Sequence, residues 1–79
     1  MITSENIRAV IQDIVLGFDA SALKDDQTFR DAGIDSLDFI NILFAIDERH
    51  GTHIPDEHVK QCNSIQAILD YVNNPVHAD

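Results

Sequence analysis

Residues 35–51 read DSLDFINILFAIDERHG, and this stretch predicts the central helix of the fold. Either Asp35 or Ser36 can cap the first turn, because a short polar side chain accepts a hydrogen bond from an otherwise unpaired backbone N–H. Gly51 suits the left-handed conformation that commonly ends a helix. We therefore predict a helix that begins at Asp35 or Ser36 and ends at Gly51.

This helix carries apolar residues on two nearly opposite sides. At about 100° per residue, one side holds Phe39, Ile42, Leu43 and Ile46, and the other holds Leu37, Ile40 and Phe44. The first side is the ordinary core face. We name Leu37, Ile40 and Phe44 the second stripe and expect it to stay partly exposed as a partner-binding surface. The alternative is that the second stripe packs under the preceding loop. Polar and acidic residues border it: Asp38, Asn41, Asp47 and Glu48.

The chain before this helix predicts one amphipathic helix and a long loop. Apolar residues recur at helical spacing from about Ser4 to Leu16, with Thr3 or Ser4 as the cap and Gly17 at the end. Residues 18–34 lose that periodicity and gain turn-forming residues, which predicts a loop. A loop of this length is usually functional or held by its own side chains, and the side chains expected to hold it are Phe18, Leu23 and Phe29.

The chain after Gly51 predicts two further helices. Pro55, read as the first helical position, begins a short helix over about Asp56 to Gln61. Asn63 or Ser64 then caps a last helix over Ile65 to Val72. The last residues, about 75–79, are expected to fray.

These elements predict an all-α fold, a small four-helix bundle with three main helices, one short third helix and a long first loop. Residues 1–79 are expected to form one domain, and no strand pattern is present. The predicted core consists of Ile7, Val10, Ile11, Ile14, Ile42, Leu43, Ile46, Ile54, Val59, Ile65, Ile68 and Leu69.

Composition narrows the classes of partner. The chain has 14 acidic and 5 basic residues and a net charge of -9, which opposes nucleic-acid binding and favours basic protein surfaces. No apolar run has the length of a membrane span, and no secretory signal pattern is visible, so we expect a cytoplasmic monomer. The single cysteine, Cys62, is expected to be a half-buried structural thiol.

Ser36 is the candidate functional residue. A hydrolytic serine needs a base, an orienting acid and oxyanion donors, but the histidine nearest to Ser36 in sequence is His50, nearly four helical turns away. As a substrate for another enzyme, in contrast, a serine at a helix N-terminus is well placed, because the helix dipole favours an attached anion. A plain capping role is the alternative.

Three segments resemble the acyl carrier protein family: residues 31–38 (DAGIDSLD), residues 54–57 (IPDE), which begin 18 residues after Ser36, and much of residues 64–72. The resemblance implies a four-helix carrier, not an enzyme, with 4'-phosphopantetheine on Ser36. A magnesium-dependent phosphopantetheinyl transferase would install this arm from coenzyme A, and Asp35 would position the transferase's metal or the serine. The resemblance also implies that the arm's thiol holds acyl groups as thioesters. The recognition helix for acyl-loading, acyl-transfer or condensing enzymes with basic patches would use Leu37, Asp38, Ile40, Phe44, Asp47 and Glu48.

The sequence also departs from the family pattern. Asn41 replaces a usual acid, Phe39 and Phe44 are bulkier than their counterparts, and Arg49-His50 replaces an acid followed by an aromatic residue. These departures weaken the case for a housekeeping fatty-acid carrier. The resemblance still implies a carrier of fatty-acid, polyketide or another specialised acyl pathway. The alternatives are a carrier of aminoacyl or aryl groups, of the peptidyl or D-alanyl type, and an acidic adaptor without a prosthetic group.

The histidines invite a metal-site interpretation that the spacing does not support. His50, His53 and His58 lie near Asp56 and Glu57, but they match no closed zinc pattern. No metal site is predicted, and His50 is instead expected to pack in place of an apolar residue at the helix end.

Overall fold

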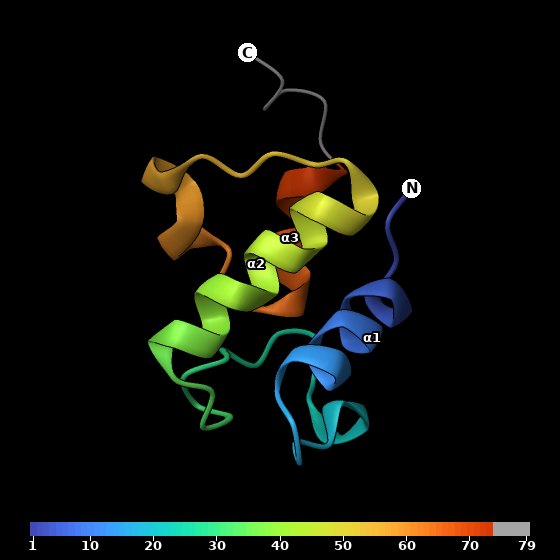
Figure 1. Cartoon of the computed structure of the whole chain (residues 1–79), viewed down its shortest axis with the longest axis vertical. Helices are drawn as coiled ribbons and strands as arrows, with labels where there is room; N and C mark the ends of the chain where they lie inside the picture. Colours follow the sequence, from blue (N-terminus) through green and yellow to red (C-terminus); the bar gives the residue numbers. More distant parts are fainter. Residues whose placement is uncertain (74–79) are drawn as a thin grey trace.

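The computed structural model describes residues 1–73, and within that range every regular element is helical. The elements are α1 (Ser4–Ile14), the 3-10 helix η1 (Ala20–Ala22), α2 (Ser36–His50), the 3-10 helix η2 (Asp56–Gln61) and α3 (Ile65–Val72). This arrangement, drawn in Figure 1, confirms the predicted helical bundle with its long first loop. The predicted frayed tail lies outside the described residues.

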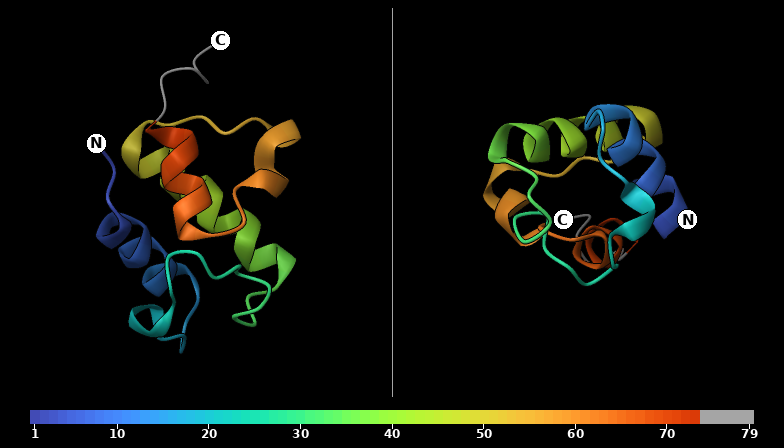
Figure 2. Two further views of the ribbon diagram at one scale, coloured as in Figure 1. Left: turned by 180° about the vertical axis from the view of Figure 1, so that it is seen from behind. Right: turned by 90° about the horizontal axis from the view of Figure 1, so that it is seen from below.

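The three α-helices enclose the core. α1 packs against both α2 and α3, and Figure 2 shows the first loop passing beneath the bundle while η2 lies beside α2. Nine of the twelve predicted core residues are buried, whereas Ile14, Val59 and Leu69 pack at the edge. The loops and η2–α3 junction add core residues that helical periodicity did not identify: Ala20, Leu23, Phe29, Ile34 and Cys62.

α1 begins as predicted and ends earlier than predicted. Thr3 and Asn6 form a reciprocal cap, in which the Asn6 N–H donates to Thr3 Oγ1 at 3.2 Å and the Thr3 N–H donates to Asn6 Oδ1 at 2.9 Å. The helix ends at Ile14, because Val15 adopts an extended conformation and the chain then turns through Gly17. Leu16, predicted to be helical, lies outside the helix and is 88% exposed.

The first loop is held by side chains from α1. The Arg8 guanidinium donates to the Leu23 carbonyl at 2.8 Å and pairs with Asp25. Leu23 and Phe29 are buried, as predicted, and Phe18 is partly buried. The loop also contains η1, which was not predicted; the Asp19 carboxylate caps it by accepting from the Ser21 N–H at 3.1 Å.

The two later helices have the predicted bounds. η2 is a 3-10 helix, and Pro55 precedes it as the capping residue, so the predicted first helical position for Pro55 is wrong. Ser64, not Asn63, caps α3 by accepting from the Ala67 N–H at 3.1 Å. Between them Cys62 is completely buried, so the expected half-burial is also wrong.

Candidate functional site

The turn before α2 displays Ser36 on the surface. Gly33 adopts a φ of 88°, a left-handed conformation that glycine accepts without the strain imposed by a Cβ atom. The side chain of the next residue, Ile34, is only 5% exposed and anchors the turn in the core. The backbone N–H of Ile34 donates to the Phe29 carbonyl at 2.9 Å. Ser36 follows as the first residue of α2 and is exposed.

Asp35, not Ser36, caps this helix. Its Oδ1 accepts a hydrogen bond from the Asp38 N–H at 2.8 Å. Capping by Asp35 leaves the serine free of that role, and no hydrogen bond within residues 1–73 involves the Ser36 hydroxyl. The structure therefore places an accessible hydroxyl beside the unpaired N–H groups of a helix N-terminus, which favour a negative charge.

An open pocket of about 580 Å³ adjoins Ser36. Its lining comes from the first loop, from the start of α2 and from the end of η2: Thr28, Phe29, Arg30, Ile34, Asp35, Ser36, Phe39, Lys60 and Asn63. The rings of Phe29 and Phe39 lie 5.7 Å apart and tilt by 47°. The Phe29 N–H donates to the Asn63 carbonyl at 2.9 Å, which ties the loop wall of the pocket to the η2–α3 connection.

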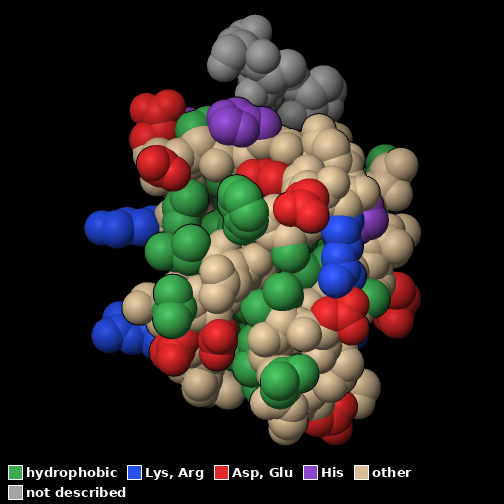
Figure 3. Space-filling view, viewed as in Figure 1, with side chains coloured by type: hydrophobic (Ala, Val, Ile, Leu, Met, Phe, Trp, Pro, Cys, Tyr) green, Lys and Arg blue, Asp and Glu red, His purple; other side chains and the backbone are tan. Residues whose placement is uncertain are grey.

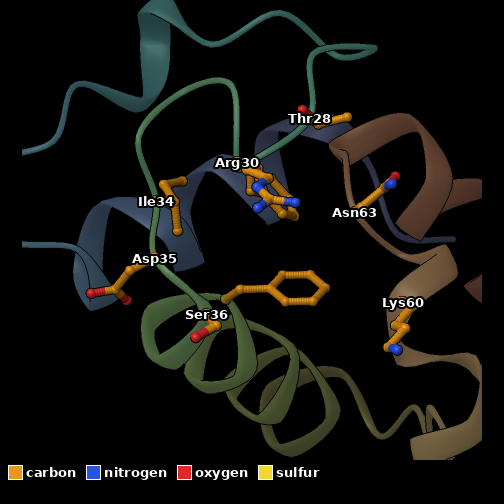
Figure 4. A pocket seen from close by; sticks show the side chains of 9 residues that line it. Thr28, Arg30, Ile34, Asp35, Ser36, Lys60 and Asn63 are labelled. Carbon is orange, nitrogen blue, oxygen red and sulfur yellow. The ribbon is translucent and has the colours of Figure 1, made fainter.

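Figure 4 shows how the polar groups surround this pocket. Asp35 and Ser36 lie on one side at the start of α2, Lys60 and Asn63 lie on the other, and Arg30 extends from the loop. The sequence reasoning missed Arg30 and Lys60, because their positions are 30 residues apart and no local pattern links them. Only the folded loop and η2 bring these two cations to one pocket.

The chemistry of the pocket suits a modified residue more than a catalytic one. Among residues 1–73, neither a histidine nor a cysteine lines this pocket, so no described residue of those types stands ready to deprotonate Ser36. The Cys62 thiol is buried, and burial, followed by the negative charge of Asp47, raises its pKa to about 11. The Cys62 thiol is therefore a protonated group in the core.

The histidines do not form a metal centre in the region from residue 1 to residue 73, where no group of three His, Cys, Asp or Glu side chains is placed to hold an ion. His50 and His53 are exposed. The packing role predicted for His50 is therefore wrong, because the side chain lies outside the core. His58 instead packs against Tyr71, with ring centroids 5.5 Å apart.

The second stripe is a surface feature, as predicted. Leu37, Ile40 and Phe44 are 67%, 55% and 70% exposed, so the alternative of burial under the first loop is wrong. Figure 3 shows hydrophobic side chains spread over the face that α2 crosses, with acidic groups around them. An exposed apolar strip that begins one residue after Ser36 is a suitable contact for a partner protein.

The polar residues that border the second stripe differ in their exposure and in their contacts within the chain. Glu48 and Asn41 are exposed and Asp38 is half-buried. Asp47 has both carboxylate oxygens engaged within the chain: Oδ1 accepts from the Thr52 hydroxyl, and Oδ2 accepts from the Ile54 N–H at 3.2 Å. The geometry thus gives Asp47 a structural contact that joins α2 to the following segment.

None of the helices in residues 1–73 has the length and apolar character needed to cross a bilayer.

Comparison with known proteins found a matching family model and a similar protein. Residues 5–72 match the family model described as a phosphopantetheine attachment site. The chain is also similar to an acyl carrier protein of Thermosynechococcus vestitus, with 33% identity over 75 residues that cover 94% of this chain and 91% of the relative. Both similarities extend across the helices that surround Ser36.

Proposed function

The chain belongs to the acyl carrier protein family, a family of carriers rather than enzymes whose cofactor is covalent 4'-phosphopantetheine, and from this premise we propose that Ser36 bears the arm. The observation that carries the proposal is an exposed serine in the first turn of α2 whose hydroxyl makes no hydrogen bond within residues 1–73. The arm, once attached, supplies a thiol that holds acyl groups as thioesters.

The residues around Ser36 fit a phosphodiester. Asp35 caps α2 through its own side chain, so the serine hydroxyl is available to form the ester bond. The free N–H groups of the first turn stabilise the negative charge that the serine acquires. Ile34 and the turn at Gly33 keep the hydroxyl at the surface, where a transferase active site can reach it.

The carrier function extends to partner enzymes that load, transfer or condense acyl groups. We assign their docking to the second stripe and to Asp38 and Glu48 at its border, while Asp35 positions the serine or the magnesium ion in the phosphopantetheinyl transferase. Basic patches on these partners complement a chain with a net charge of -9. The chain acts as one monomeric cytoplasmic domain in fatty-acid, polyketide or another specialised acyl metabolism, with aminoacyl or aryl cargo as the alternative.

A loading assay tests the function. The purified chain is incubated with coenzyme A, Mg²⁺ and a promiscuous phosphopantetheinyl transferase, and its intact mass is measured. We expect the mass of one phosphopantetheine group to be added to the unaltered chain and to Ser21→Ala, a matched control at another exposed serine, but not to Ser36→Ala. An unmodified chain beside a fully modified control carrier would refute the proposal, as would modification of Ser36→Ala.

A further inference from the structure

The pocket beside Ser36 has an unusual charge for this molecule. The chain carries only 5 basic residues, and two of them, Arg30 and Lys60, line this one pocket. Arg8 and Arg49 are engaged in ion pairs with acidic side chains, whereas no ion pair within residues 1–73 involves Arg30 or Lys60. Among the described residues, two cations without an ion-pair partner thus line one pocket of a strongly acidic protein.

The acidic group nearest to these cations in the lining does not neutralise both of them. Among the described residues that line the pocket, Asp35 is the acidic one, and its Oδ1 accepts from the Asp38 N–H at 2.8 Å. Counting Arg30 and Lys60 against Asp35, the lining has a formal charge of +1 in a molecule of -9. Such a pocket attracts an anion, because no carboxylate within residues 1–73 forms an ion pair with either cation.

We propose that this pocket selects acyl groups that end in a carboxylate. The inference rests on the proposed attachment of the arm to Ser36. A flexible arm tethered there can fold back so that its cargo lies against Phe39, whose partly buried ring packs on the buried ring of Phe29 with the centroids 5.7 Å apart. The far end of the cargo then meets Arg30 and Lys60, which lie across the pocket from Ser36 in Figure 4.

The pocket discriminates by the chemistry of the cargo's far end. A terminal carboxylate gains charge-assisted hydrogen bonds from the guanidinium and the ammonium group. A neutral hydrocarbon of the same length gains only the aromatic contact and leaves both cations to water. The phosphodiester does not serve as the anion in this arrangement, because it stays at the α2 N-terminus, where Ser36 and the free N–H groups lie.

The test uses three loaded forms of the full chain. Synthetic coenzyme A analogues deliver arms of equal length whose cargo ends in a carboxylate, a primary amide or a methyl group, joined through an amide that resists hydrolysis. We expect the carboxylate form to melt about 2–4 °C above the amide form at low salt, which is the size of effect that an exposed ion pair has in a small domain. The backbone NMR signals of Arg30, Lys60 and Asn63 should shift in the carboxylate form alone.

Variants that each remove one positive charge identify the cations that bind the terminal carboxylate. Arg30→Gln and Lys60→Gln should each reduce the difference between the carboxylate and amide forms. Lys24→Gln should leave it intact, because Lys24 is exposed and lies outside this pocket. Equal melting of the carboxylate and amide forms would overturn the inference, as would a difference that persists in both pocket variants.

Two further outcomes separate this inference from the proposed function. If the bare arm shifts the signals of Arg30 and Lys60 as strongly as the carboxylate cargo does, the phosphodiester is the bound anion and the inference is overturned. If none of the three arms can be attached to the chain, the failure belongs to the assignment of Ser36 itself, and the inference falls with it.

Discussion

The Asp35 carboxylate has two roles that a pair of substitutions can separate. It caps α2 at 2.8 Å from the Asp38 N–H, and it lies next to Ser36, where we propose that it assists the transferase. Asparagine caps a helix as well as aspartate does, whereas alanine lacks the capping oxygen. We expect Asp35→Asn to keep the stability of the chain but to slow arm attachment severalfold.

The Asp35→Ala variant supplies the comparison, measured by urea unfolding and by the rate of arm attachment. Its free energy of unfolding should fall by about 0.5–2 kcal/mol, because the first turn loses its cap. If Asp35→Asn accepts the arm at the unaltered rate, Asp35 acts only as a cap, and its assignment to the transfer reaction is wrong.

The Cys62 thiol predicts a pH dependence of stability. Its pKa rises from the ordinary value of 9.0 to about 11 in the folded chain, chiefly through burial and secondarily through the charge of Asp47. Between these two values the unfolded chain loses the thiol proton while the folded chain keeps it, so ionisation favours unfolding. This contribution to stability is complete below pH 9.0 and declines as the pH rises towards about 11.

Comparison with Cys62→Ala isolates this effect from other groups that titrate at high pH. We expect the difference in free energy of unfolding between the unaltered chain and the variant to be constant below pH 9.0 and to shrink above it. Urea unfolding at a series of pH values provides the measurement. A difference that stays constant to pH 11 would show that Cys62 ionises equally in both states.

Single residues were predictable from sequence where their role is local. The cap at Asp35 or Ser36 and the glycine at the end of α2 depend on neighbours in the chain, and both are present in the structure. The complete burial of Cys62 was missed, because it depends on how η2 and α3 pack over the core and not on any neighbour in sequence.

At the scale of elements, α2 presents its second stripe and acidic border to partners. We expect Asp38→Lys and Glu48→Lys to slow arm attachment by reducing the rate of association with a basic transferase. Added salt should have the same effect on the unaltered chain, because it screens charges separated by more than about 8 Å at physiological ionic strength. Attachment rates at several salt concentrations provide the measurement.

A matched control for docking is Asp26→Lys, which changes the net charge equally at an exposed residue in the first loop. If docking depends on the border of the second stripe, this control should slow attachment less than Asp38→Lys and Glu48→Lys do. Equal effects of all three substitutions would show that overall charge, and not the α2 surface, governs recognition.

Elements were predictable to different degrees. α2, η2 and α3 have the expected bounds, because proline, glycine and capping side chains mark their ends. α1 ends before Leu16 although the apolar pattern continues, because the chain turns at Val15 and the Gln12 side chain binds the Ala20 N–H at 3.1 Å. The pocket was not predictable, since its walls come from the first loop, α2 and the η2 end.

At the scale of the whole molecule, a net charge of -9 in 79 residues opposes folding through self-repulsion. Ion pairs offset this repulsion only between neighbouring side chains. One of these pairs joins Arg49 to Asp13 at 2.9 Å. We expect the melting temperature to rise when sodium chloride is increased from low ionic strength to about 0.15 M, because screening weakens the repulsion.

A charge variant checks the cause of this salt effect. Asp26→Lys removes one negative charge and adds a positive one, so it should melt higher than the unaltered chain at low salt and respond less to added salt. Thermal unfolding followed by circular dichroism measures both quantities. A melting temperature that falls on addition of salt would contradict the account, since it would mean that attractive ion pairs outweigh the repulsion.

We propose that one displayed serine makes this chain a carrier, and fragmentation mass spectrometry of the loaded protein can identify that serine. After incubation with coenzyme A, Mg²⁺ and transferase, the fragments are searched for the residue that bears phosphopantetheine. We expect a single modified residue, Ser36. Attachment at any other serine, or a chain that stays unmodified while a control carrier is loaded, would contradict it.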